Sequence, residues 1–158
     1  MSSVTQSGLI SLEGNGWSHK YARRQWNLVD NHELCYHYLG DFDREMLKTI
    51  TSEKNFNKTP VVEIWHNDGD QVLAFMRGDL LFVFNFSPTR SFTDYGFLVP
   101  TGSYSVVLDS DNKDFGGNGL NDDTMTHLTS YDPLYVKDRK EWLKLYLPAR
   151  TALVLKKN

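Results

Sequence analysis

The chain has 158 residues, of which 40% are hydrophobic and 23% charged, the composition of an ordinary globular domain. Its formal net charge of -3 argues against nucleic acid and anionic membranes as partners, because both would favour a basic surface. No apolar run approaches the roughly 20 residues that a transmembrane helix needs. We therefore predict neither a nucleic-acid partner nor a membrane partner.

The N-terminus and the single cysteine suggest where the protein works. The first residues lack the basic segment and the long apolar stretch of a secretory signal peptide. With one cysteine, Cys35, no intrachain disulfide can form. Cys35 lies in a predicted helix, where we interpret it as a buried structural thiol. A cytoplasmic location is the simplest interpretation.

The first third of the chain has helical periodicity. Residues 1–12 are polar and irregular, and Ser18 is a suitable N-cap for a short helix that reaches Trp26. A second helix is predicted over residues 31–49, because apolar residues recur there at intervals of three and four. They are Leu34, Tyr38, Leu39, Phe42, Met46, Leu47 and Ile50. This stripe needs a surface to pack against. Gly40 weakens the helix without ending it, and residues 51–60 are predicted to be a linker.

After Pro60 the apolar period shortens to that of strands, and turn residues become frequent. Residues 67–70, Asn-Asp-Gly-Asp, are typical of a tight hairpin turn. Residues 80–86 are nearly all apolar, which predicts a central strand covered on both faces. The other strands are predicted at residues 61–66, 71–76, 96–99, 103–108, 125–129, 142–147 and 151–155. The pattern indicates a mainly β fold, an antiparallel β-sandwich preceded by one or two helices.

The acidic residues do not form a catalytic pattern. They cluster in predicted turns, where carboxylates usually cap backbone amides and face water. The pairs are Asp68 and Asp70, Asp109 and Asp111, and Asp122 and Asp123. The five histidines are scattered, and the chain has neither a Gly-x-Ser-x-Gly elbow nor a P-loop. We predict no catalytic residue and no cofactor.

The segment from Asp109 to Gly117 has spaced carboxylates and an amide, which are ligands that calcium prefers. Lys113, however, occupies the fifth position of the calcium loop pattern, and Asp114 stands where that pattern needs glycine. We therefore favour a loop ordered by Asx turns and glycines, and we predict no metal site.

Exposed aromatic rings can stack on the C–H faces of sugars. Phe92, Tyr95 and Phe115 fall in predicted loops and are the candidates for such contacts. Trp65 and Trp142 fall in predicted strands, and the orientation of Trp142 stays open.

A series of motifs resembles one protein family. Residues 13–18 (EGNGWS) and 21–31 (YARRQWNLVDN) are similar to the end of the catalytic barrel in the α-glucan branching enzymes of the α-amylase superfamily. The similarity covers residues 13–158 in order. It continues at residues 38–44 (YLGDFDR), 81–95 (LFVFNFSPTRSFTDY), 107–111 (VLDSD), 115–117 (FGG) and 147–153 (LPARTAL).

The resemblance implies a domain organisation. Residues 13–52 would be a helical segment that completes a (β/α)8 barrel, and residues 60–158 would be the C-terminal β-sandwich. The apolar stripe of the second helix would then lie against the barrel. Residues 1–12 depart from the family, because residues 8–12 (GLISL) stand where Pro-Glu-Trp and Asp-Phe-Pro-Arg are usual. This atypical segment suggests a truncated gene, a rearranged gene or an artificial boundary.

The resemblance also implies what the parent enzyme does. It would cut an α-1,4 glucan and transfer the piece to a 6-hydroxyl through a covalent glycosyl-enzyme. The aspartate nucleophile, the glutamate acid/base and a second aspartate all lie in the barrel before residue 13, so none is carried over and the chain alone is not predicted to be an enzyme.

Our hypothesis is a non-catalytic C-terminal domain of a glycogen branching enzyme. It would support the catalytic barrel and contact α-glucan through Phe92, Tyr95 or Phe115. The alternatives are a free-standing carbohydrate-binding module and a truncated gene product without function.

Overall fold

The computed structural model describes residues 26–131 and 140–158. The chain forms two compact units, Met1–His37 and Tyr38–Asn158. In the first unit a short 3-10 helix, η1 (Trp26–Leu28), precedes a turn in which the N–H of Leu34 donates to the carbonyl of Asn31 at 3.0 Å. The predicted helix that begins at Ser18 falls outside the described residues except at Trp26.

The long helix α2 spans Tyr36–Ser52 and continues through Gly40, as predicted. It begins five residues later than predicted because Asn31 closes a turn instead of starting the helix. The side chain of Asn31 accepts from the N–H of Glu33 at 3.0 Å. Cys35 consequently lies in this turn and is exposed, so the prediction of a buried helical thiol is wrong.

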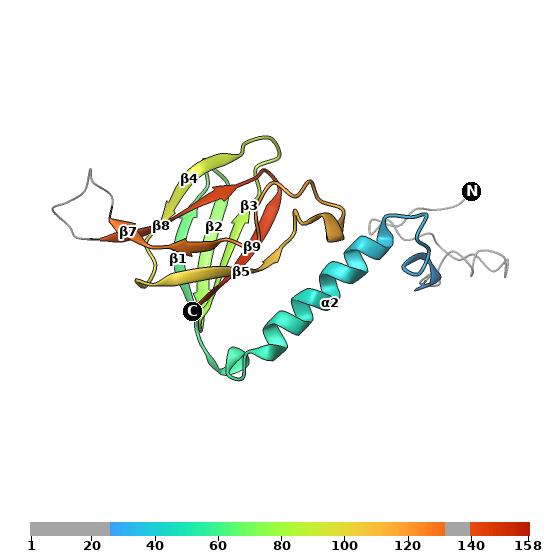
Figure 1. Ribbon diagram of the computed structural model, residues 1–158, viewed down its shortest axis with the longest axis horizontal. Helices are drawn as coiled ribbons and strands as arrows, with labels where there is room; N and C mark the ends of the chain where they lie inside the picture. Colours follow the sequence, from blue (N-terminus) through green and yellow to red (C-terminus); the bar gives the residue numbers. More distant parts are fainter. Residues whose placement is uncertain (1–25, 132–139) are drawn as a thin grey trace, which may run out of the picture. The chain divides into compact units, whose positions relative to one another are not determined.

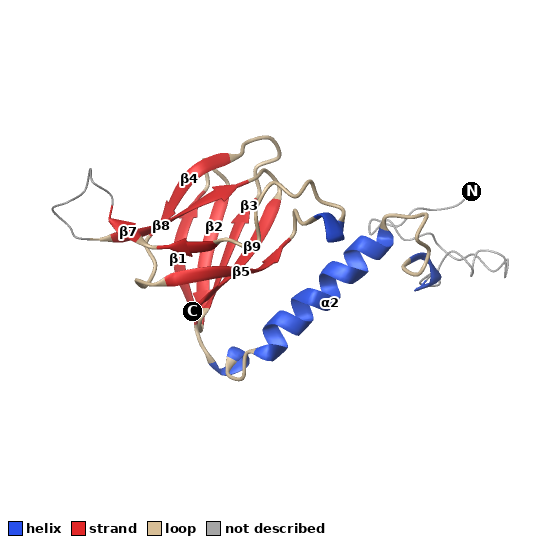
Figure 2. Cartoon of the chain, viewed as in Figure 1, coloured by secondary structure: helices blue, strands red, loops and turns tan. Residues whose placement is uncertain are grey.

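The strands form two antiparallel sheets (Figures 1 and 2), which confirms the predicted fold class. The six-stranded sheet has the order β1-β2-β3-β9-β5-β6 and the three-stranded sheet the order β4-β8-β7. The bounds in the large sheet are β1 Val61–Asn67, β2 Val72–Arg77, β3 Leu80–Asn85, β9 Thr151–Lys157, β5 Ser103–Asp109 and β6 Thr126–Leu128. The bounds in the small sheet are β4 Phe92–Phe97, β8 Glu141–Leu147 and β7 Ser130–Tyr131.

The main core lies between the two sheets, which makes the fold a sandwich. Its side chains come from alternate positions of strands in both sheets, as strand geometry requires. The large sheet contributes Val72, Ala74, Met76, Leu81, Val83, Tyr104, Leu153 and Leu155, and the small sheet contributes Phe97, Leu143, Leu145 and Leu147. The phenol of Tyr104 is fully enclosed and donates to the carbonyl of Pro100 at 2.6 Å.

A second apolar cluster covers the outer face of the large sheet. Phe42 and Met46 of α2 pack there against Leu80, Leu108 and Val154. The predicted central position of β3 is confirmed, because β3 lies between β2 and β9. Its inner face lies in the main core, whereas its outer face is covered only in part, at Leu80 and Phe82. The helical stripe was expected to lie against the barrel, but part of it, Phe42 and Met46, packs on the sandwich.

The segment between α2 and β1 is attached to the large sheet and is not the predicted linker. It contains the 3-10 helix η2 (Phe56–Lys58), and the guanidinium of Arg77 lies over the ring of Phe56 at 4.3 Å. Arg77 also donates to the carbonyl of Thr59 at 3.0 Å. An ion pair between Lys156 of β9 and Glu53 fixes the end of α2.

Candidate functional site

A groove with a volume of about 620 Å³ lies beside β1 and β4, each at an edge of its sheet. The groove is lined by aromatic rings together with amide, carboxylate, hydroxyl and ammonium groups. The lining residues are Trp65, Asn67, Asp70, Thr93, Asp94, Tyr95, Gly96, Lys140, Trp142 and Lys144.

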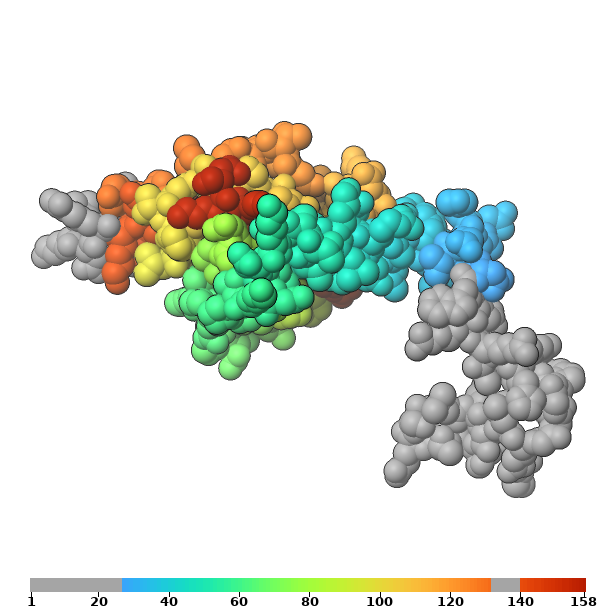
Figure 3. Space-filling view, turned by 90° about the horizontal axis from the view of Figure 1, so that it is seen from below, coloured from blue at the N-terminus to red at the C-terminus, as the bar shows by residue number. Residues whose placement is uncertain are grey.

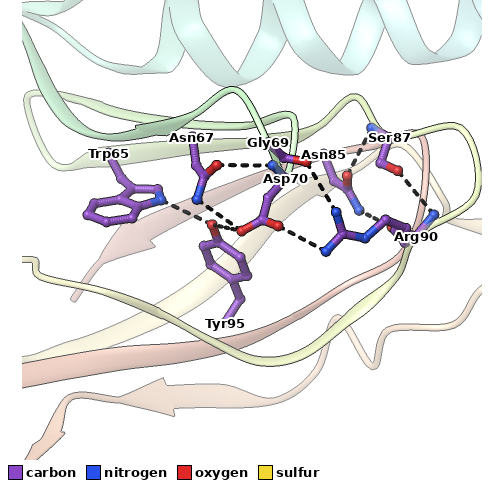
Figure 4. A network of polar contacts seen from close by, with 8 residues as sticks. All are labelled: Trp65, Asn67, Gly69, Asp70, Asn85, Ser87, Arg90 and Tyr95. Atoms are coloured by element: carbon purple, nitrogen blue, oxygen red, sulfur yellow. Dashed lines mark hydrogen bonds and ion pairs between the residues drawn. The ribbon is translucent and has the colours of Figure 1, made fainter.

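Trp65 reaches the groove because β1 contains a bulge. The pairing of β1 with β2 shifts between Glu63 and Trp65, so Ile64 is the extra residue and packs on the main core. Trp65 then pairs with Ala74. At this edge its indole is still 42% exposed, and its N–H donates to the hydroxyl of Tyr95 at 3.1 Å (Figure 4).

Tyr95 also owes its position to a bulge. Phe92 pairs with Leu147, whereas Tyr95 pairs with Leu145, so β4 holds one residue more than β8 over this stretch. Asp94 absorbs the difference with a left-handed backbone, φ 52°. Because Leu145 and Leu147 both face the core, Phe92 and Tyr95 face it too. The prediction that these two aromatics lie in loops is therefore wrong. The strand predicted at residues 96–99 exists as β4, but its bounds are Phe92–Phe97.

Asp70, which lines the groove, is the centre of a polar network (Figure 4). Its Oδ2 accepts the hydroxyl proton of Tyr95 at 3.1 Å and an amide proton of Asn67 at 3.0 Å. Its Oδ1 pairs with Arg90 at 3.0 Å, and Arg90 also donates to the carbonyl of Gly69 at 3.1 Å. Burial raises the pKa of the Tyr95 phenol above its ordinary value of 10.0, which keeps this hydroxyl a donor.

The loop that carries Arg90 is held by buried polar groups. The buried amide of Asn85 donates to the carbonyls of Arg90 and Pro148, both at 2.9 Å. Its oxygen accepts from the N–H of Ser87 at 3.0 Å, and the hydroxyl of Ser87 accepts from the N–H of Arg90 at 3.1 Å. These contacts fix the arginine that balances the charge of Asp70.

Trp142 forms part of the lining from the small sheet. Side chains point to alternate faces along β8, and the next residues Leu143 and Leu145 face the core. The side chain of Trp142, directly before Leu143, therefore lies on the face of the small sheet that is turned away from the core. Its ring packs on Gly96, where an added Cβ would lie 3.4 Å from Cε3 of the indole. Its indole N–H is buried and has no hydrogen-bond partner among the described residues.

The three aromatic residues predicted to contact sugar, Phe92, Tyr95 and Phe115, lie in different surroundings. Tyr95 lines the groove. Phe92 lies next to it, with ring centroids 5.1 Å apart, but it is half-buried against the core under the guanidinium of Arg90. Phe115 belongs to the second apolar cluster and meets Phe42 edge to face at 5.4 Å.

Sequence reasoning missed Trp65 and Trp142 as groove residues. The alternation of Trp142 with leucines along residues 142–147 was a signal that this indole faces away from the core. No sequence signal revealed the bulges that position Trp65 and Tyr95.

The acidic loop after β5 is built from Asx turns, as predicted. The side chains of Asp109 and Asn112 accept from the N–H groups two residues on, at 2.8 Å and 2.9 Å. Asp122 caps Thr124 in the same way at 3.0 Å. Within the described ranges, no group of three or more His, Cys, Asp or Glu side chains is arranged to hold a metal, and no helix is long and apolar enough to cross a bilayer.

The two antiparallel sheets and the core between them define the class: an all-β antiparallel sandwich domain. Residues 64–158 match the family model of the alpha amylase C-terminal all-beta domain. The match covers more than half of the chain, which therefore belongs to this family.

The chain is also similar to 1,4-alpha-glucan-branching enzymes. Identity is 44% over 143 residues with the enzyme of Emericella nidulans, 41% over 142 residues with that of Saccharomyces cerevisiae and 42% over 151 residues with that of Dictyostelium discoideum. The alignments cover 89–92% of this chain but only 20–21% of each enzyme. The chain thus spans about a fifth of the length of these curated relatives.

Proposed function

We propose that the chain is a non-catalytic C-terminal part of a glycogen branching enzyme and that it supports the catalytic barrel of that enzyme. The observation that carries the proposal is the combination of about 40% identity along nine tenths of the chain with coverage of only a fifth of the relatives. The reaction itself, cleavage of α-1,4 links and transfer to a 6-hydroxyl, would then belong to the remaining four fifths.

The helix α2 has the exposure expected of an element shared by two bodies. Phe42 and Met46 pack on the sandwich, yet none of the 17 helical residues is buried. Leu39 and Leu47, beside them on the helix, are 62% and 54% exposed, and Figure 3 shows the face of α2 in that view uncovered. A helix of this length gains most of its stability from packing, so a second apolar surface against Leu39 and Leu47 supports the proposal.

The outer face of the large sheet offers further apolar surface. Phe75 and Phe84 lie nearly parallel with centroids 5.9 Å apart, and Phe84 stacks on Phe86 at 5.6 Å. Phe86 ends this series and is 61% exposed. Contiguous exposed apolar surface of this kind marks interaction sites in soluble proteins. It would be covered by the barrel.

Three further features belong to the same proposal. The parent enzyme would act on α-glucan, and this domain would contact the glucan through aromatic residues, among them the earlier candidates Phe92, Tyr95 and Phe115. We place the protein in the cytoplasm, which the absence of disulfide-forming cysteine pairs supports. The net charge of -3 supports our expectation that nucleic acid and membranes are not partners.

The test is association with a barrel that lacks this part. The chain would be mixed with the Saccharomyces cerevisiae enzyme shortened by its aligned C-terminal segment, and co-elution would be measured by size-exclusion chromatography. We expect wild-type chain to co-elute and Leu47→Asp to fail while keeping its circular dichroism spectrum. Lys48→Asp, the control at the neighbouring exposed residue, which lies about 100° around α2 from Leu47, should still co-elute.

Two outcomes would contradict the proposal. A free-standing carbohydrate-binding module would bind glycogen but would not co-elute with the shortened enzyme. A gene product without function would do neither. Equal co-elution of wild type and Leu47→Asp would also remove the role that we assign to α2.

A further inference from the structure

We propose that Asn118, which Gly119 follows in the loop after β5, is a site of spontaneous deamidation, and that Asp111 keeps this site unreactive while the loop is closed. The sequence has two asparagines directly followed by glycine, Asn15 and Asn118. Of these, Asn118 lies in the described part of the chain. The modification is a property of this loop and does not depend on the proposed function.

Deamidation is fastest where glycine follows the asparagine, because the next backbone nitrogen must reach the side chain. The nitrogen of Gly119 attacks Cγ of Asn118 and forms a succinimide ring. The bond from Cγ to Nδ2 breaks, and Nδ2 leaves as ammonia with the proton of the attacking N–H. Glycine has no Cβ to hinder this approach. Both residues are exposed to the water that then opens the ring to aspartate or isoaspartate.

In the closed loop Asp111 binds both reacting groups. Its backbone carbonyl accepts the N–H of Gly119, the attacking group, at 2.6 Å. Its Oδ1 accepts from Nδ2 of Asn118, the leaving group, at 3.2 Å and from the backbone N–H of the same residue at 2.9 Å. Asp111 is itself only 6% exposed. Because one buried residue holds both groups, the ring can close only after these contacts break in a local opening of the loop.

Deamidation would prevent the loop from closing again in the same way. It would place a carboxylate oxygen where Nδ2 now lies, 3.2 Å from Oδ1 of Asp111. A hydrogen bond would then be replaced by repulsion between like charges. The same loop supports α2, since the ring of Phe115 meets that of Phe42 edge to face. The modification would therefore loosen the contact between this loop and α2.

Mass spectrometry of the peptides that carry Asn118 and Asn15 tests the site in wild-type protein. The chain would be incubated in mildly alkaline buffer with and without guanidinium chloride. In the denaturant the two asparagines should deamidate at similar rates, since each has glycine on both sides. In the folded chain Asn118 should react at least about tenfold more slowly than in the denaturant, because only the open loop reacts. Equal rates for Asn118 in the two conditions, or no reaction of Asn118 in the denaturant, would overturn the proposal.

A pair of variants tests the role of Asp111. Asp111→Ala should speed the deamidation of Asn118 in the folded chain, towards the rate in the denaturant. Asp114→Ala is the matched control, because Asp114 is an exposed carboxylate of the same loop whose side chain accepts no hydrogen bond from the described residues. It should keep the wild-type rate.

Circular dichroism checks that both variants are folded. Equal deamidation rates in the two variants would overturn the role of Asp111. The comparison of folded and denatured wild type decides the case even if Asp111→Ala fails to fold.

Discussion

Asp111 orders the loop that follows β5 through both oxygens of its side chain. Oδ1 accepts from the N–H of Asn118 at 2.9 Å and Oδ2 from the N–H of Leu120 at 3.0 Å. The loop therefore folds back over Asp111, and Gly117 touches its backbone. An added Cβ at Gly117 would lie 2.2 Å from the carbonyl oxygen of Asp111. The carboxylate of Asp111 is buried. It accepts the hydrogen bonds that the loop N–H groups would otherwise donate to water.

Gly117→Ala should therefore lower the free energy of unfolding more than Gly78→Ala does. Backbone atoms on both sides of the clash cannot move independently, so we expect a loss of about 3 kcal/mol in the free energy of unfolding. Gly78→Ala is the matched control, because Gly78 has a left-handed backbone but open space around it. Its loss should be about 1 kcal/mol. Urea unfolding measures both, and equal losses would contradict the contact.

The carboxyl of Asp109 should make the stability of the chain depend on pH. Burial raises the pKa of its carboxyl above the ordinary value of 3.8, although hydrogen bonds from Asp111 and Asn121 oppose the shift. The folded state thus binds this proton more tightly than the unfolded state. The stability that this group contributes is complete below pH 3.8 and is lost as pH rises through the raised pKa.

Asp109→Asn should remove this loss, because an amide keeps the acceptor for Asp111 and is not charged. The free energy of unfolding of the variant, relative to wild type, should rise as pH increases from about 3.5 to about 7. Urea unfolding of both proteins across this range measures the difference. A difference that stays constant, or that moves in favour of wild type, would show that burial does not penalise the Asp109 carboxylate.

The strand β4 depends on the backbone conformation of one residue, Asp94. Asp94 is the residue that keeps Phe92 and Tyr95 on the same face of the strand, and it does so with φ at 52°. Aspartate tolerates this region, glycine prefers it and β-branched residues avoid it.

Replacement of Asp94 should follow that order. Asp94→Val is expected to cost about 1 to 2 kcal/mol in the free energy of unfolding, whereas Asp94→Gly should stay within about 0.5 kcal/mol of wild type. Thermal or urea unfolding separates the two. If valine and glycine gave the same stability, the bulge would not depend on a left-handed residue.

Elements with a regular period could be predicted from the sequence, and elements with irregular backbone could not. Helix α2 and the strand β8 show their apolar spacing directly. The strand β4 was misplaced because Phe92 and Tyr95 are three residues apart, which in a regular strand would put them on opposite faces. The groove has the same cause, since the positions of Trp65 and Tyr95 follow from bulges that leave no mark in the hydrophobic pattern.

At the scale of the whole molecule, the chain combines a buried core between its two sheets with large apolar side chains that are exposed at the surface. Both sheets contribute side chains to the core between them, so the inner apolar faces of the sandwich are buried within the chain itself. Leu39, Leu47 and Phe86 stay exposed on α2 and at the end of β3. A domain that supports a larger protein needs both properties, because it must fold and must still offer a surface to its neighbour.

The most direct test of this account is a branching assay that follows the iodine stain of amylose. We expect no change of stain with the chain alone, weak activity with the Saccharomyces cerevisiae enzyme shortened by its aligned C-terminal segment, and restored activity when the two are mixed. A shift of stain caused by the chain alone, or a mixture no more active than the shortened enzyme, would contradict the claim that this chain supports catalysis without performing it.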